Sequence, residues 1–228
     1  KPYGLVLICG PTGCGKTTTL HSVMRELNTD QRKIWTAEDP VEIEQEGLRQ
    51  VQVNPRIGWT FAAAMRTFLR ADPDVVMIGE MRDEETARIA VEASLTGHLV
   101  LSTLHTRDAP NAVSRLLDMG VEPFLLSSAI DTGVAQRLAR KLCENCKTAV
   151  MVPAEQMQHN GFHVDEDVPV CKPVGCDRCN NTGYRGRLGV FEVLMMTEQI
   201  RELVLRRASA DEIAAVAAQD GMVRLRED

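Results

Sequence analysis

A glycine-rich segment near the start of the chain has the residue types needed to bind phosphate. It matches the pattern GxxxxGK[ST] and follows an apolar run; the residues are Gly10, Pro11, Thr12, Gly13, Cys14, Gly15, Lys16 and Thr17, followed by Thr18. Glycines let backbone N–H groups approach phosphate oxygens, the lysine reaches the β- and γ-phosphates, and the threonine hydroxyl ligates Mg²⁺. A glycine-rich turn without a ligand would need neither Lys16 nor Thr17. The segment therefore predicts binding of ATP or ADP with Mg²⁺.

Acidic residues follow two predicted strands and are candidates for chemistry at that phosphate. Glu80 comes just after the apolar run 75–78, where a carboxylate can hold Mg²⁺ through water or polarise the attacking water. Glu38 and Asp39 end another predicted strand, at the carboxyl edge where such sheets bind ligands. An acid beyond a strand is by itself more often a solvated loop residue. The upstream phosphate loop favours the functional interpretation for Glu38 and Glu80.

Two histidines bracket the next predicted strand. His98 stands at its start and His105 beyond its end, so we expect them at opposite edges of the sheet, with His105 on the nucleotide side. A polar residue in that place can hydrogen-bond the γ-phosphate and report its loss; the alternative is a histidine that is hydrogen-bonded locally in a loop. The sensor role is favoured for His105, whereas for His98 the two interpretations are equal.

Four of the seven cysteines form two CxxC pairs. Cys143 and Cys146 make one pair, and Cys176 and Cys179 make the other. Two such pairs supply four thiolates for tetrahedral Zn²⁺, and with all positions filled the site would be structural rather than catalytic. Two dithiols without a metal are the alternative, but the polar stretch between the pairs needs something other than a core to hold it. The other candidate ligands, which lack this spacing, are Cys171, His159 and His163.

The elements that must position these residues alternate between strands and helices. The predicted strands cover residues 5–9, 33–36, 49–53, 75–78 and 98–102. The predicted helices cover residues 16–27, a segment that begins after Thr60, and residues 83–95. This alternation predicts an α/β fold with a mainly parallel sheet.

In the rest of the chain the hydrophobic periodicity changes twice. The periodicity is helical throughout 108–143, and the polar stretch 151–170 has no sustained period, which predicts a loop-rich insertion. A short strand over 190–194 leads to two helices, the second announced by a capping box of Ser209 and Glu212.

Composition limits the class of protein. The 228 residues carry a net charge of −6, which argues against a protein whose whole surface grips nucleic acid. No apolar run approaches the roughly 20 residues of a membrane-spanning helix, and the first residues show no secretory signal. We therefore expect neither a transmembrane segment nor secretion.

These motifs together resemble a known family, the GspE-like and PilB-like ATPases of bacterial type II secretion and type IV pilus assembly. The matching elements are the Walker A motif at 10–17, an aspartate box at 36–42, an atypical Walker B at 72–83 and a histidine box at 96–106. The resemblance implies a RecA-like P-loop NTPase core that assembles as a homohexamer and uses ATP hydrolysis to drive pilin or pseudopilin polymerisation. It also implies a location in the cytoplasm, peripheral to the inner membrane, and an inner-membrane platform protein as partner.

The resemblance also implies roles for individual residues. Lys16 and Thr17 would hold phosphate and Mg²⁺, Glu38 would activate water, Glu80 would support Mg²⁺ or share that task, and His105 would sense the γ-phosphate. The roles of Glu38 and Glu80 could be exchanged. Arginines that could contact phosphate within or across subunits are Arg66, Arg70 and Arg82.

The resemblance further implies a division into three parts. We expect a RecA-like core over 1–142, a tetracysteine zinc subdomain over 143–187 and a C-terminal helical subdomain over 188–228, without the family's N-terminal domains. Arginines from those domains would be missing, so hydrolysis is expected to be weak. In the family the tetracysteine element marks assembly rather than retraction ATPases, and the sequence does not separate the secretion branch from the pilus branch.

The principal rival is a RecA-like helicase or DNA translocase with a zinc ribbon. The segment 143–187 holds five basic and six acidic residues, whereas a DNA clamp would be basic. Aromatic residues at 4% offer few platforms for stacking bases. A small-molecule kinase would need an acceptor pocket that no motif identifies. No nucleic-acid partner is therefore expected.

Overall fold

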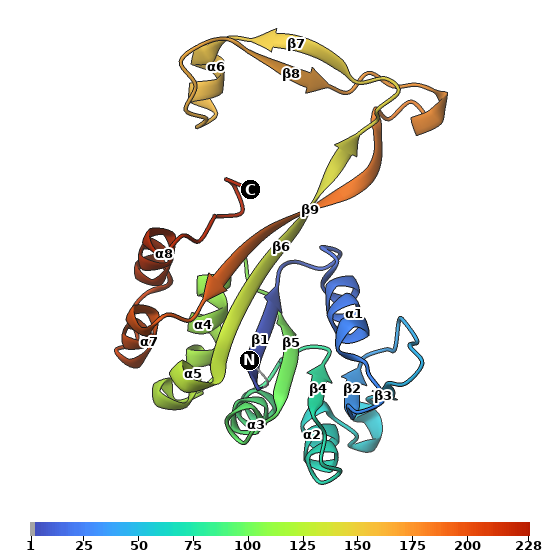
Figure 1. The fold of residues 1–228 in the computed structure, drawn as a ribbon, viewed down its shortest axis with the longest axis vertical. Helices are drawn as coiled ribbons and strands as arrows, with labels where there is room; N and C mark the ends of the chain where they lie inside the picture. The colour runs from blue at the N-terminus through green and yellow to red at the C-terminus, as the bar shows by residue number, and fades with distance from the viewer. Residues whose placement is uncertain (1–2) are drawn as a thin grey trace. The chain divides into compact units, whose positions relative to one another are not determined.

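The computed structural model describes residues 3–228, which divide into two compact units. The first unit comprises the residues up to Arg137 together with Val190–Asp228, and the second comprises Leu138–Gly189. The C-terminal helices therefore group with the residues up to Arg137 (Figure 1).

The first unit is built on a seven-stranded sheet in the order β3-β2-β4-β5-β1-β6-β9. The strands are β1 (Gly4–Cys9), β2 (Ile34–Glu38), β3 (Arg49–Gln52), β4 (Val75–Ile78), β5 (Leu99–Leu104), β6 (Ile130–Leu142) and β9 (Tyr184–Met195). The strands from β3 to β6 pair in parallel. The predicted fold class, a mainly parallel α/β sheet, is confirmed, and the phosphate loop follows β1, an interior strand between β5 and β6.

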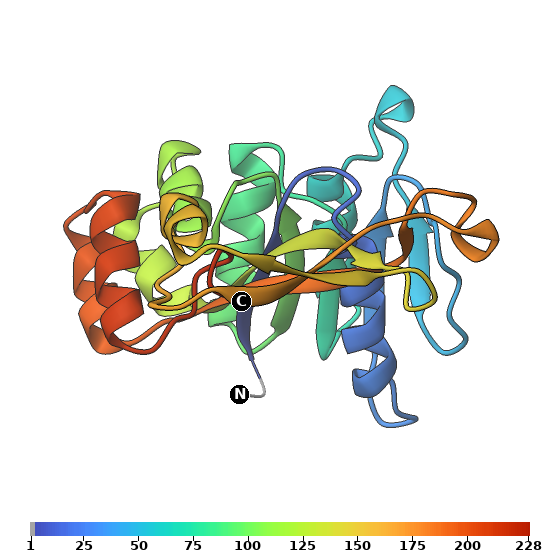
Figure 2. The same cartoon turned by 90° about the horizontal axis from the view of Figure 1, so that it is seen from above.

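Helices cover both faces of this sheet. They are α1 (Lys16–Leu27), α2 (Phe61–Leu69), α3 (Glu84–Leu95), α4 (Ala109–Asp118) and α5 (Pro123–Ala129). Alternate strand residues enter two separate cores: Val75 and Met77 of β4 pack with Leu20 and Met24 of α1, whereas Val76 packs in the larger core that includes α2 and α3. Figure 2 shows α1 on the opposite side of the sheet from α2 and α3. Burial on both faces explains why β4 is continuously apolar.

Capping contacts confirm the predicted starts of three helices. The Thr60 hydroxyl accepts a hydrogen bond from the Ala63 N–H at the start of α2, and Asp83 caps α3 in the same way. At the C-terminus, α7 (Glu198–Leu205) precedes α8 (Ala210–Gln219), and α8 has the reciprocal Ser209–Glu212 capping box. Local side-chain signals therefore located these helices correctly.

The prediction of helix throughout 108–143 is wrong for its last third. Residues 130–142 form β6, which pairs in parallel with β1 from Leu5 to Cys9. Ile130, Val134 and Leu138 recur every four residues, a spacing that also fits a helical face. Pairing with the interior strand β1 overrides that local preference.

The second unit contains a hairpin where the sequence predicted a loop-rich insertion. Strands β7 (Thr148–Val152) and β8 (Val168–Lys172) pair antiparallel and flank the short helix α6 (Ala154–His159). The prediction failed because each strand has only five residues and the apolar alternation is too short to outweigh the polar stretch between them.

Candidate functional site

The phosphate loop has a backbone that only glycine can follow at its start. Gly10 has a φ of +150°, and a Cβ added there would lie 2.6 Å from both the Cys14 Sγ and the Gln136 carbonyl oxygen. The loop ends at Gly15, which is in the left-handed region and begins α1 without a side-chain cap. Lys16 Nζ donates to the carbonyls of Gly10 at 2.9 Å and Pro11 at 3.0 Å. An uncapped helix N-terminus beside a lysine is suited to phosphate.

A glutamine of β6 connects this loop to helix α1 by hydrogen bonds. The buried Gln136 donates from Nε2 to the Cys14 carbonyl at 2.6 Å, and its Oε1 accepts from the Thr19 hydroxyl of α1 at 2.8 Å. The sequence does not single out this residue, because the periodicity of its segment predicts a helix where the structure has a strand. A strand at this position would have pointed to Gln136, because a buried polar side chain next to the phosphate loop needs a hydrogen-bond partner.

Four ionisable side chains meet at the carboxyl ends of three adjacent strands. Arg82 donates to Glu80, and its other terminal nitrogen lies 3.6 Å from Asp39 Oδ2, while His105 Nε2 lies 3.5 Å from Glu80 Oε2. Asp39 follows β2, Glu80 and Arg82 follow β4, and His105 follows β5. The Arg82 hydrogen bond lowers the pKa of Glu80 despite partial burial, and the charges of Arg82, His105 and Lys16 lower it further.

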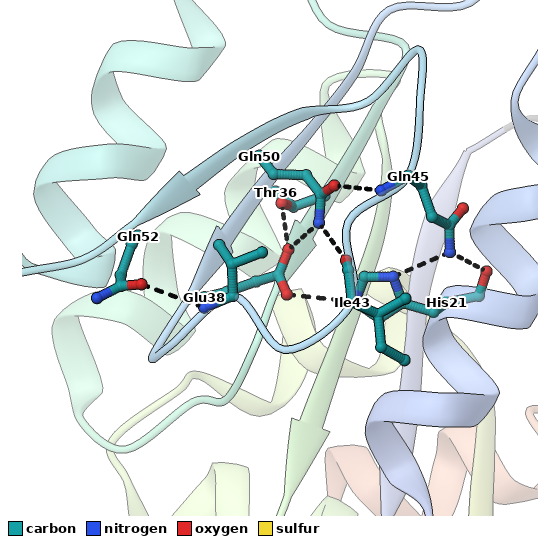
Figure 3. A network of polar contacts seen from close by, with 8 residues as sticks. His21, Thr36, Glu38, Ile43, Gln45, Gln50 and Gln52 are labelled. Atoms are coloured by element: carbon teal, nitrogen blue, oxygen red, sulfur yellow. Dashed lines mark hydrogen bonds and ion pairs between the residues drawn. The ribbon is translucent and has the colours of Figure 1, made fainter.

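Glu38 lies in a separate, buried network (Figure 3). Its Oε1 accepts from the Thr36 hydroxyl at 2.6 Å and from Gln50 Nε2 at 3.0 Å, while its Oε2 lies 3.2 Å from His21 Nε2 of α1. Gln45 Nε2 in turn lies 2.9 Å from His21 Nδ1. Sequence reasoning missed these partners, because a histidine or glutamine in an amphipathic pattern carries no motif of its own.

The remaining candidate residues make local contacts. His98 lies at the opposite end of β5 from His105, and its Nδ1 lies 2.9 Å from the Ala93 carbonyl. Arg66 pairs with Glu85 on α3. The structure therefore brings Glu80 and His105 together and leaves Glu38 and His98 in other surroundings.

The four CxxC cysteines of the second unit converge. Among residues 3–228, the group whose ligand atoms could hold a metal is Cys143, Cys146, Cys176 and Cys179, all within 4.8 Å of one another. The closest sulfur pairs are separated by 3.7, 3.8 and 3.9 Å. A tetrahedron of Zn–S bonds of about 2.3 Å has edges of about 3.8 Å, so the donor set fits Zn²⁺.

Backbone donors support the same cluster. The N–H groups of Cys176 and Gly183 both donate to Cys179 Sγ at 3.2 Å, and the Gly175 N–H donates to Cys146 Sγ at 3.3 Å. Such bonds orient thiolates as outer contacts of a metal site. Cys171 is exposed on β8 and lies outside this group.

Fold and site together define the class: a P-loop nucleotide-binding core with a parallel sheet and an appended tetracysteine unit. Within that class, the sequence matches the family described as "Type II/IV secretion system protein" over residues 1–228. The chain belongs to this family.

Curated relatives are about 50% identical to this chain over the aligned residues. It is 52% identical over 234 residues to the type IV pilus assembly ATPase PilB of Myxococcus xanthus, covering 99% of this chain and 40% of the relative. It is 51% identical over 204 residues to the type II secretion system protein E of Aeromonas hydrophila, covering 90% of this chain and 41% of the relative. The chain thus spans about 40% of the length of these relatives.

Solved structures of a pilus motor and of another ATPase share the fold. The pilus retraction motor PilT with bound ADP has a TM-score of 0.66 at 27% identity, over 99% of this chain and 60% of that one. The ATPase DotB of Legionella pneumophila has a TM-score of 0.64 at 28% identity, over 99% of this chain and 55% of that one. Across residues 3–228, no helix is both long enough and apolar enough to cross a membrane.

Proposed function

We propose that this chain is an ATP-hydrolysing motor domain that powers pilin or pseudopilin assembly in type IV pilus biogenesis or type II secretion. The observation that carries the proposal is the phosphate loop next to the Glu80, Arg82 and His105 cluster, in a chain about 50% identical to assembly and secretion ATPases. The charge of Lys16 acts on Glu80, which links the loop to the cluster.

The roles we propose are supported by this geometry together with family membership. Lys16 holds the β- and γ-phosphates, Thr17 ligates Mg²⁺, and the loop 10–18 wraps the phosphates with its backbone. Glu38 accepts a proton from the attacking water, and Glu80 supports Mg²⁺ or shares that task. His105 touches Glu80, so a change at the γ-phosphate would reach both side chains together.

Zn²⁺ has a structural role in this proposal. The four cysteines fill a tetrahedral set, so no open position is left for substrate. Such an element also favours assembly over retraction, in keeping with the names of the relatives at about 50% identity.

The assembly that we propose is a homohexamer in the cytoplasm, peripheral to the inner membrane, with an inner-membrane platform protein as partner. The core, the tetracysteine unit and the C-terminal helices, 188–228, would be its functional parts. The basis for these proposals is family membership.

A nucleotide titration tests the proposal. Lys16→Ala removes the ammonium that would meet the phosphates, so we expect the affinity for a fluorescent ATP analogue to fall by at least about tenfold, equivalent to about 1.4 kcal/mol. Lys33→Ala is the matched control, because this lysine pairs with the exposed Asp72 outside the loop. Equal binding by wild type and Lys16→Ala would contradict the proposal.

Added DNA tests the rival helicase function. We expect the rate of phosphate release to stay the same with single- or double-stranded DNA. A severalfold stimulation would favour a nucleic-acid motor.

A further inference from the structure

We propose that His21 is a positioning residue for the Glu38 carboxylate, and that Gln45 fixes the tautomer in which it acts. This inference rests on the proposed function, in which Glu38 accepts the proton of the attacking water.

The strand pattern brings Glu38 and α1 together. Ile34 of β2 packs in the same core as Leu20 and Met24 of α1. Because side chains alternate along a strand, Thr36 and Glu38 lie on the same face of the sheet as Ile34. His21 follows Leu20 on α1, and both His21 and Glu38 are only 3% exposed.

Hydrogen bonding defines which nitrogen of His21 carries the proton. The Gln45 amide nitrogen can only donate, so His21 Nδ1, 2.9 Å away, accepts. The ring proton is then on Nε2, which donates to Glu38 Oε2 at 3.2 Å. Gln45 Nε2 also lies 2.8 Å from the His21 carbonyl, which holds the amide in this orientation (Figure 3).

The two oxygens of Glu38 differ in what they can still accept. Oε1 has two donors, Thr36 and Gln50, whereas Oε2 has His21 alone. A carboxylate oxygen offers about two acceptor sites, so Oε2 keeps one for a proton. The bond from His21 therefore sets the direction in which that free site points.

The same helix carries the phosphate ligand. Lys16 begins α1, and His21 lies five residues later, about 7.5 Å along the axis at 1.5 Å per residue. In the proposed step, water loses a proton to Glu38 Oε2 while its oxygen bonds to the γ-phosphorus and the bond to the bridging oxygen of ADP breaks. One rigid element would thus position both the phosphate and the base.

Steady-state kinetics separate positioning from simple structural support. His21→Leu removes the donor, and we expect kcat for ATP hydrolysis to fall by about 10- to 100-fold, the cost of misplacing a catalytic group, while KM and the affinity for the ATP analogue change less than about twofold. His21→Gln keeps an N–H for Glu38 and an acceptor for Gln45, so it should restore most of kcat. Ser22→Ala is the control on the next residue of α1, where the hydroxyl bonds only the Thr18 carbonyl.

Two results would overturn the positioning role. One is a His21→Gln variant as slow as His21→Leu, and the other is a loss in kcat matched by an equal loss of nucleotide affinity, as general damage would cause.

Ring NMR tests the geometry even if the proposed function fails. Nitrogen-15 shifts of the histidine rings, assigned with His21→Gln, should show His21 protonated at Nε2 and bare at Nδ1. A ring protonated at Nδ1, or at both nitrogens, would overturn the inference independently of any activity. A wild-type chain with the expected tautomer but no ATP hydrolysis would instead count against the proposed function.

Discussion

The two candidate glutamates have different partners, which suits them to different tasks. Glu80 is paired with Arg82 and His105, and the Arg82 hydrogen bond lowers its pKa, so it stays ionised. Glu38 has mostly neutral donors, the Thr36 hydroxyl and the Gln50 amide, beside His21. Within the proposed function, the ion pair with Arg82 supports the metal-supporting role that we propose for Glu80.

Arg82 provides a direct test of this arrangement. Arg82→Gln removes the hydrogen bond that most lowers the Glu80 pKa, so that pKa should rise toward the ordinary glutamate range. Because a lowered pKa keeps the carboxylate ionised at lower pH, the variant should protonate Glu80 at a higher pH than wild type. Carboxyl carbon-13 NMR titration measures the shift.

Arg66→Gln is the matched control, because that arginine pairs with Glu85 instead. A Glu80 titration that is the same in wild type and Arg82→Gln would show that the ion pair does not form in solution.

At the scale of elements, the sequence predicts the helices, strands and loops whose positions are determined by local residue types. The phosphate loop has fixed residue types, Thr60 and Ser209 announce helix starts, and runs such as 75–78 are too apolar for a surface segment. The strand β6 was not predicted, because its extended conformation depends on pairing with β1, more than 120 residues earlier in the chain. The periodicity of a single sequence carries no information about such long-range pairing.

The same limit applies to the candidate site. Glu80, His105 and the cysteines were predicted because motifs contain them, and the structure places them in clusters. His21 and Gln136 were missed because their importance comes from partners on other elements. A residue whose role depends on a tertiary contact becomes visible only when the elements are assembled.

Gln136 is the testable link between β6 and the phosphate loop. Gln136→Leu leaves the Cys14 carbonyl and the Thr19 hydroxyl without their partner in a buried place. We expect the free energy of unfolding to fall by about 1–3 kcal/mol. Nucleotide affinity should fall as well, because the loop loses its support. Urea unfolding and the ATP-analogue titration measure the two effects.

Gln158→Leu is the control for replacing a glutamine, since its side chain bonds the Val164 carbonyl on an exposed part of the second unit. Unchanged nucleotide affinity in Gln136→Leu would mean that the loop keeps its conformation without β6.

At the scale of the whole molecule, the two units are stabilised by different means. The first has two apolar cores on either side of its sheet. In the second, the buried residues of 138–189 are Cys143, Cys179 and Gly183, so the cysteine cluster is its interior. A unit with so little apolar burial needs a cross-link such as a structural metal, and the binding of that metal contributes directly to the free energy of folding.

Removing the metal should therefore affect the units unequally. We expect Cys146→Ser, or chelation of the wild type, to remove about one zinc per chain and to unfold the β7–β8 hairpin, while the first unit keeps its structure and its nucleotide affinity. Cys171→Ser is the matched control, because that cysteine is exposed on β8 and lies outside the cluster. Metal analysis, hydrogen exchange of the hairpin amides and the ATP-analogue titration follow the three quantities. A metal-free protein with a fully protected hairpin would show that the four thiols stabilise this unit without zinc. Unfolding of both units on loss of the metal would show that they fold as one.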